Sequence, residues 1–257
     1  MKYDVLTTKQ EIELSKEKMN ASEKQCKKFN VSTRRGIESI YDSYFHKFLR
    51  RIAPVIFHLK NISHHSKVLS EKTTGYYSQY RFFHLFKRII QIQPKLIVEY
   101  GSGASTAFIA EVLRYMKNTD QEVGKIISFE QSEKYYDLVQ SNFPEELREY
   151  AEIKLAPVQY KRYGDFRGLS YKIDKYPSSV DLAYIDAPTR TRGDSNTQEF
   201  WLMSDIIELI NNGCDLKFAL TDKRFVNYLA YKKLLGHKYY IKLVKKYRSI
   251  EIQKKSV

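Results

Sequence analysis

Short apolar runs alternate with helical stretches from about residue 78 to residue 253, and this alternation limits the possible folds more than any other feature of the sequence. The runs have the length of buried strands, and the stretches between them carry apolar residues at helical spacing. We expect strands over residues 96–100, 125–130, 151–156, 180–186, 216–221, 239–244 and 247–253. We expect helices over residues 78–92, 105–116, 132–142, 199–211 and 224–235. This alternation predicts an α/β protein with a Rossmann-like, doubly wound and mainly parallel seven-stranded sheet.

Two parts of this region depart from the simple alternation. Only Lys245 and Lys246 separate the last two strands, which predicts an antiparallel C-terminal hairpin at one edge of the sheet. Residues 157–179, between the third and fourth strands, are predicted to form a long polar loop.

The N-terminal part of the chain has a different pattern. Residues 9–30 are predicted to form a polar helix, residues 36–49 a second helix, and residues 61–75 a linker. We therefore expect an N-terminal helical extension with its linker over residues 1–72 and the main domain over residues 73–257.

Composition narrows the class of protein further. No apolar run approaches the roughly 18–20 residues that a membrane-spanning helix needs, and the N-terminus lacks the apolar segment of a secretory signal. Cys26 and Cys214 lie far apart, so neither a disulfide framework nor a cysteine metal site is predicted. A cytoplasmic location is expected, whereas the oligomeric state stays open.

The net charge of +14 is unevenly distributed along the chain. Residues 1–75 carry +7, residues 76–221 carry −2, and residues 222–257 carry +9. Basic flanks of this kind can attract a phosphate-rich partner, such as a nucleic acid, by long-range electrostatics. They can also simply keep the protein soluble.

A glycine-containing turn, Glu99-Tyr-Gly101-Ser-Gly103, follows the first strand and precedes a helix. Ligands of doubly wound sheets bind at the carboxyl ends of the strands, so this turn lies where a ligand is expected. A dinucleotide fingerprint would need a glycine at position 106, where this chain has Thr106, and the phosphate-loop motif is absent. A pyrophosphate ligand is therefore not favoured.

Two acidic residues suit a different ligand. S-adenosylmethionine carries an ammonium group and no phosphate, so Glu99 beside the turn can help to hold its methionine end. Glu130 ends the second strand, where a carboxylate can accept hydrogen bonds from both ribose hydroxyls.

These motifs resemble those of class I S-adenosylmethionine-dependent methyltransferases, and they are most similar to the O-methyltransferase-like branch. The resemblance covers about residues 76–253, and the C-terminal hairpin agrees with the family's usual strand order. It implies that the first acid and the glycine turn contact the methionine moiety, that the second acid holds the ribose, and that residues after the third strand flank the adenine. The implied cofactor-binding residues are Glu99, Gly101, Gly103, Ser105, Glu130, Pro157 and Val158.

The fourth strand ends in Asp186, which the resemblance places beside the transferred methyl group. Asp186 is the predicted catalytic residue, because it could deprotonate or orient an acceptor hydroxyl. Together with Asp222, after the fifth strand, it also resembles the metal site of catechol-type enzymes. Those enzymes have an asparagine directly after the second acid, where this chain has Lys223, so no metal is predicted.

Basic residues surround the expected acceptor side. Arg190 and Arg192 follow Asp186, and Lys223 and Arg224 follow the fifth strand at the same edge. We predict that Arg190 and Arg192 bind the acceptor and that the acceptor is anionic.

Three functions remain open at this point. The first is methyl transfer to an oxygen, less readily a nitrogen, of an anionic small-molecule or glycan-like acceptor. The second is methylation of RNA or DNA held by the basic flanks. The third is a non-catalytic scaffold with a methyltransferase fold.

Overall fold

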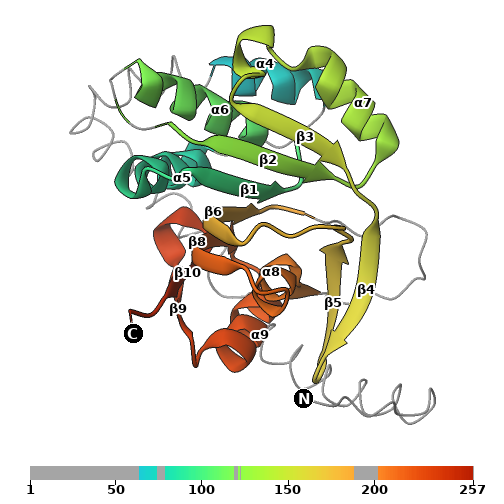
Figure 1. Ribbon diagram of the computed structural model, residues 1–257, viewed down its shortest axis with the longest axis vertical. Coiled ribbons are helices and arrows are strands. Elements are labelled where there is room, and N and C mark those ends of the chain that lie inside the picture. Colours follow the sequence, from blue (N-terminus) through green and yellow to red (C-terminus); the bar gives the residue numbers. More distant parts are fainter. Residues whose placement is uncertain (1–63, 74–78, 119–120, 122, 188–201, 257) are drawn as a thin grey trace, which may run out of the picture. The chain divides into compact units, whose positions relative to one another are not determined.

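The fold is described from a computed structural model of the chain (Figure 1). The structure describes residues 64–73, 79–118, 121, 123–187 and 202–256. The chain divides into two compact units, Met1–Phe57 and His58–Val257, and all the described residues belong to the second unit. The predicted helices over residues 9–30 and 36–49 lie outside the described residues.

A seven-stranded sheet in the order β3-β2-β1-β6-β8-β10-β9 forms the centre of this unit. Its strands are β1 (Leu96–Tyr100), β2 (Lys125–Glu130), β3 (Ala151–Leu155), β6 (Ser179–Ile185), β8 (Asp215–Asp222), β9 (Tyr239–Val244) and β10 (Ser249–Lys254). The first five strands of the order are mutually parallel, and β10 runs antiparallel to both β8 and β9. The predicted seven-stranded, mainly parallel sheet with an antiparallel C-terminal hairpin is therefore confirmed.

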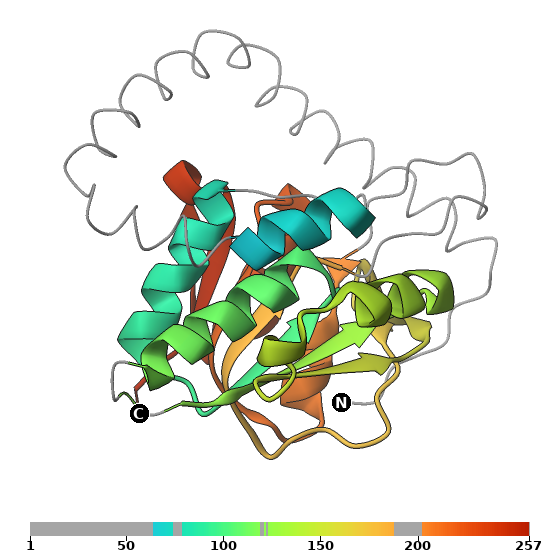
Figure 2. The same cartoon turned by 90° about the horizontal axis from the view of Figure 1, so that it is seen from above.

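Helices cover both faces of this sheet, as a doubly wound fold requires (Figure 2). One face carries α4 (His64–Thr73), α5 (Gln79–Ile92), α6 (Ala104–Lys117) and α7 (Glu133–Asn142). The other face carries α8 (Asp205–Asn211) and α9 (Phe225–Leu235). Among the described residues, no helix combines the length and apolar character needed to cross a membrane.

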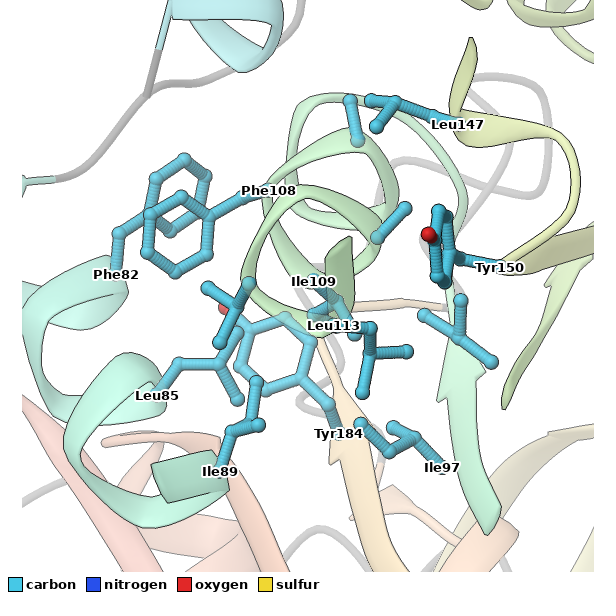
Figure 3. Close-up of a cluster of buried hydrophobic side chains, with 14 of the residues drawn as sticks. Phe82, Leu85, Ile89, Ile97, Phe108, Ile109, Leu113, Leu147, Tyr150 and Tyr184 are labelled. Atoms are coloured by element: carbon cyan, nitrogen blue, oxygen red, sulfur yellow. The ribbon is translucent and has the colours of Figure 1, made fainter. Parts of the chain in front are cut away.

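Alternating side chains of the strands supply the two halves of the core. Ile97 and Leu182 point to the face of α5 and α6, whereas Val98 points to the face of α8 and α9. In the first half, Phe82 of α5 stacks on Phe108 of α6 with the ring centroids 4.7 Å apart (Figure 3). Close packing of this kind fixes α5 and α6, and with them the ends of the loops that carry the site.

The predicted linker over residues 61–75 is wrong where the structure describes it. Residues 64–73 form α4, which packs on α6 and belongs to the compact unit His58–Val257. Leu69 is 1% exposed, and the Ser66 hydroxyl donates a 2.6 Å hydrogen bond to the carbonyl of Ala104. The compact unit His58–Val257 therefore includes α4.

The predicted long polar loop is also wrong. It contains a hairpin of β4 (Val158–Tyr163) and β5 (Phe166–Tyr171), and β5 pairs in parallel with the short strand β7 (Leu202–Met203). The hairpin forms because the two strands pair through their whole length around Gly164, whose φ of +58° suits a tight turn.

The helix predicted over residues 199–211 begins later than expected. β7 and Ser204 precede α8 directly, so the described helix covers only the second half of the predicted range. The backbone N–H of Ser204 donates to the carbonyl of Leu169 at 2.9 Å, which continues the pairing with β5 instead of starting a helical turn.

Candidate functional site

The turn between β1 and α6 requires its two glycines. Gly101 has φ +102° and Gly103 has φ +141°, which are backbone conformations that other residues rarely adopt. A Cβ atom on Gly101 would lie 2.6 Å from the Cβ of Ala187. The turn therefore lies tightly against the segment that follows β6, and this contact brings the ends of β1 and β6 into one site.

The buried side chain of Glu99 holds this turn in place through hydrogen bonds. Its side chain is fully buried, and its Oε2 atom accepts hydrogen bonds from Thr106 at 2.5 Å and from Ser128 at 2.6 Å. The Thr106 hydroxyl also accepts a hydrogen bond from the backbone N–H of Gly103 at 2.9 Å. Glu99 thus links β1, β2 and the first turn of α6, but it does not line the cavity beside the turn.

The environment of Glu99 favours its neutral form. Burial raises the pKa of the Glu99 carboxyl to about 7, although the hydroxyls of Ser105, Ser128 and Thr106 lower it. Its second oxygen, Oε1, is buried and has no partner with hydrogen-bond geometry. An unpartnered carboxyl oxygen of this kind is a candidate for contact with a bound group that carries a donor.

Glu130 ends β2 on the other side of the turn, as the sequence predicts. Its Oε1 atom accepts hydrogen bonds from the backbone N–H groups of Gln131 at 2.8 Å and Ser132 at 2.9 Å. Its Oε2 atom accepts one from the Ser102 hydroxyl at 3.1 Å. These bonds hold the carboxylate in a single orientation.

A cavity of about 360 Å³ lies between these elements. It is lined by Gly101, Ser102, Ala104, Ser105, Glu130, Gln131, Ser132, Tyr135, Asp186 and Ala187. Two of these residues are acidic, and none is a lysine, arginine or histidine. The described lining therefore favours a ligand with positive charge and disfavours a pyrophosphate.

Six lining residues were not predicted as site residues from the sequence, namely Ser102, Ala104, Gln131, Ser132, Tyr135 and Ala187. Gln131 and Ser132 follow Glu130 directly, and the Ser132 side chain caps the first turn of α7 by accepting a 3.3 Å hydrogen bond from the Tyr135 N–H. The Tyr135 hydroxyl in turn donates a 3.3 Å hydrogen bond to Thr73 of α4. The serine cap was the available signal, because a serine directly before a helix marks its first turn.

Asp186 lies at the opposite end of the cavity from Glu130 along the sheet edge. The backbone N–H groups of Asp186 and Ala187 both donate to the carbonyl of Tyr100, which ties the end of β6 to the end of β1. The side chain of Asp186 is 34% exposed, and its Oδ1 atom lies 2.5 Å from Nη1 of Arg81 in α5. Arg81 was not predicted as a site residue.

Asp222 ends β8, the strand next to β6, and has a basic partner of its own. Its Oδ2 atom lies 2.8 Å from Nε of Arg224, and its Oδ1 atom accepts a 3.2 Å hydrogen bond from the backbone N–H of the same residue. Among the described residues, no group of three or more His, Cys, Asp or Glu side chains is arranged to hold a metal ion.

The structure does not bring all the predicted residues together. The cavity is lined by four of the predicted residues, namely Gly101, Ser105, Glu130 and Asp186. Glu99 and Gly103 do not line it, but both form hydrogen bonds with Thr106 and so support the turn beside the cavity. Pro157 and Val158, predicted beside the adenine, do not line it, because the chain continues there into the β4–β5 hairpin. The predicted acceptor residues Arg190 and Arg192 lie outside the described residues.

The strand order completes the description of the fold. Five parallel strands are followed by a hairpin whose last strand inserts between β8 and β9, and the glycine turn and both acids lie at the carboxyl ends of β1, β2 and β6. This is the class I methyltransferase fold. The predicted resemblance is thus confirmed at the level of the fold.

Comparison with known proteins gives only distant likenesses. No protein-family model and no curated protein matches the sequence. Among solved structures, a methyltransferase from Geobacter sulfurreducens is similar with a TM-score of 0.47 and 11% identity, covering 83% of this chain and 98% of that one. An O-methyltransferase from Bacillus cereus in complex with SAH is similar with a TM-score of 0.41 and 11% identity, covering 88% and 94%. Likenesses at this level carry no argument about function.

Proposed function

We propose that the protein is an S-adenosylmethionine-dependent methyltransferase. The observation that carries the proposal is the acidic cavity at the carboxyl edge of β1, β2 and β6, with the glycine turn on one side and Glu130 on the other. S-adenosylmethionine has a sulfonium and an ammonium group against a single carboxylate. A lining with two carboxylates and no basic side chain fits this net positive charge.

The residues around the cavity fit the parts of this cofactor. The fixed carboxylate of Glu130 can accept hydrogen bonds from ribose hydroxyls, as in the predicted role. The backbone N–H groups in the first turn of α6, next to Ser105, have no partner within the helix and can bind a carboxylate. Glu99, which was predicted to contact the methionine end, lies behind the same turn and supports it through hydrogen bonds from Thr106 and Ser128.

The chemistry requires little from the protein besides positioning. The cofactor supplies an electrophilic methyl group for in-line displacement by the acceptor. Gly101, packed against Ala187, brings the cofactor side of the cavity next to Asp186. In this proposal Asp186 orients the acceptor hydroxyl and accepts its proton.

We infer that the acceptor is an anionic small molecule or a glycan-like molecule, methylated at an oxygen or, less readily, at a nitrogen. Lys223 is exposed directly after the end of β8, at the acceptor edge, and supports an anionic acceptor. Arg190 and Arg192 remain predicted acceptor-binding residues.

Calorimetry with S-adenosylmethionine tests the cofactor assignment. We expect the wild-type protein to bind it and Glu130→Ala to bind about 10- to 100-fold more weakly, because a hydrogen bond to a charged group contributes about 1.5–3 kcal/mol. Glu133→Ala is the matched control, since this carboxylate is exposed in the first turn of α7 and should leave affinity unchanged. A wild-type protein that does not bind the cofactor would refute the proposal.

A nucleic-acid acceptor is a second candidate, favoured by one observation. Eight basic residues are exposed in the part of the C-terminal region that the structure describes, namely Lys223, Lys232, Lys233, Lys238, Lys242, Lys245, Arg248 and Lys254. Binding through phosphates predicts that RNA affinity falls steeply as salt is raised. Failure of RNA and DNA to bind even at low salt would remove this candidate.

A further inference from the structure

Two acidic side chains lie one strand apart at the acceptor edge of the sheet. β6 and β8 are parallel neighbours with Ile185 opposite Thr221, so Asp186 and Asp222 follow the paired ends of the two strands. Carboxylates at adjacent strand ends repel each other, and oxygen ligands of this kind attract hard divalent cations. A positive charge close to both carboxylates would therefore stabilise this edge of the sheet.

Arg81 supplies this charge from α5. Its Nη1 atom lies 2.5 Å from Oδ1 of Asp186, and its side chain is 22% exposed. Burial lowers the pKa of Arg81, but Asp186, Tyr184 and Asp222 together raise it above the usual value for arginine. The guanidinium group therefore lies in the electrostatic field of both strand-end acids.

We propose that Arg81 is the positioning residue of the acceptor step, and that its guanidinium takes the place that a divalent cation would have between the ends of β6 and β8. This inference rests on the proposed methyltransferase function. Arg81 fixes one oxygen of Asp186 and neutralises its charge, while Arg224 engages Asp222. The acceptor step then proceeds without a metal ion, because the carboxylates that would bind one already have guanidinium partners.

The choice of arginine has a physical reason. The guanidinium group stays charged at any pH at which the protein is folded, and its planar donors fix the direction of a carboxylate. A mobile ion held by two carboxylates would compete with the acceptor for the same oxygens. A side chain anchored in α5 holds Asp186 in place before the acceptor arrives.

Magnesium chloride is the probe for the first test, with the melting temperature as the readout. We expect neither millimolar Mg²⁺ nor EDTA to change the melting temperature of the wild-type protein. Arg81→Gln should melt slightly lower and recover part of this small loss in millimolar Mg²⁺, because removing the guanidinium group leaves the two carboxylates uncompensated. Arg81→Lys keeps the charge, so it should respond to Mg²⁺ as little as the wild type does.

Arg114→Gln is the matched control for this test. Arg114 also lies 2.5 Å from a carboxylate oxygen, that of Glu111 in the same helix, α6. Its loss should lower the melting temperature without creating a response to Mg²⁺. The proposal is overturned if the wild type itself is stabilised by Mg²⁺ in a manner that Asp186→Asn abolishes, or if Arg81→Gln responds no more than Arg114→Gln.

A second readout separates positioning from simple stabilisation. Arg81→Gln should keep the affinity for S-adenosylmethionine and lose turnover, and in the Asp186→Asn background it should slow the enzyme no further, because Arg81 acts through Asp186. Additive losses in the double variant would overturn the proposal. A wild-type protein that fails to bind the cofactor at all would instead refute the proposed function. The response of the melting temperature to Mg²⁺ would still test whether the Arg81 guanidinium takes the place of a divalent cation.

Discussion

At the scale of single residues, Glu99 and Asp186 show how two carboxylates of one site take different roles. Glu99 is fully buried among hydroxyl groups, and burial raises its pKa to about 7. Asp186 is partly exposed beside a guanidinium group. The buried acid therefore shapes the turn, and the exposed acid is the one that can meet an acceptor.

The raised pKa of Glu99 predicts a pH dependence of stability. Because the folded-state pKa lies above that of the unfolded chain, the stabilisation is fully present below about pH 4.5 and is lost as the pH rises through 7. Glu99→Gln mimics the neutral acid, so its stability relative to wild type should increase by up to about 3 kcal/mol between these limits. Urea unfolding at pH 5 and pH 8 measures the change, and the exposed Glu133→Gln is the control. A constant difference between the two proteins would contradict the buried, neutral acid.

Asp186→Asn tests the base of the acceptor step. Asparagine keeps the shape of the side chain but cannot accept a proton, so turnover on the true acceptor should fall by about 10²–10⁴-fold. The melting temperature should change little, since a partly exposed ion pair contributes at most about 1 kcal/mol. Turnover within about threefold of wild type would remove Asp186 as the base. Tight cofactor binding without turnover over a broad acceptor panel would favour the scaffold.

The residue pattern around the turn could be predicted because it is local. Gly101, Ser105 and Glu130 directly follow or end strands that the sequence shows clearly, so their place at the sheet edge follows from the topology. Arg81 could not be predicted, because it lies 105 residues from Asp186 and in a helix whose rotation the sequence does not fix. Contacts across the fold need the packed structure.

At the scale of elements, a buried polar network joins α5 to β10. His84 is 2% exposed, and its ring nitrogens lie 2.8 Å from the Ser249 hydroxyl and 2.7 Å from Oε1 of Glu251. Nε of Arg88 donates to the same Glu251 oxygen at 2.9 Å. The network holds α5 over the last strand of the sheet, and α5 in turn carries Arg81.

The same network predicts sensitivity to acid. Burial raises the pKa of Glu251, but hydrogen bonds from His84 and Arg88 outweigh it and lower the pKa to about 2. Its contribution is therefore present above about pH 4.5 and is lost as the pH falls toward 2. Glu251→Gln should cost about 3 kcal/mol at neutral pH, and the difference from wild type should shrink below pH 4.5.

Unfolding in urea at pH 6 and pH 3 provides the measurement for Glu251→Gln. Glu152→Gln is the control, because Glu152 forms an exposed ion pair with Lys154 at 3.0 Å and should matter little at either pH. An equal loss in Glu251→Gln at both pH values would show that the carboxylate charge does not carry the effect.

The elements that the sequence misplaced share a physical cause, which is the weakness of their apolar pattern. α4 buries Ser66, Ser70 and Thr73 beside Leu69, so it packs through small polar side chains and gives no apolar stripe. In the β4–β5 hairpin, lysine and arginine interrupt the strands. The Gly164-Asp165 pair between two aromatic residues was the signal that could have revealed this hairpin.

At the scale of the whole molecule, the compact unit His58–Val257 contains every described part of the site. Both halves of the described core and all the lining residues of the cavity fall within it. The strand order of this unit could be predicted, because the alternation of apolar runs and helices leaves few ways to build a doubly wound sheet. That α4 belongs to this unit could not be predicted, because the helix packs through small polar side chains and shows no apolar stripe.

Two truncations test where the functional unit begins. The fragment 58–257 should fold cooperatively and bind S-adenosylmethionine as tightly as the whole chain, because it keeps both cores and the cavity. The fragment 74–257 loses α4, with buried Leu69 and the hydrogen bonds from Ser66 to Ala104 and from Tyr135 to Thr73. Loss of one buried leucine costs about 2–5 kcal/mol, so this fragment should be much less stable.

The two fragments should also differ in cofactor affinity. Ala104 and Tyr135, which form hydrogen bonds with Ser66 and Thr73 of α4, both line the cavity, so removing the helix should loosen that wall and weaken binding. Thermal unfolding and calorimetry on both fragments measure the two effects separately. Equal stability and equal affinity in 58–257 and 74–257 would show that α4 contributes to neither, and the functional unit would then begin at residue 74, close to the predicted boundary.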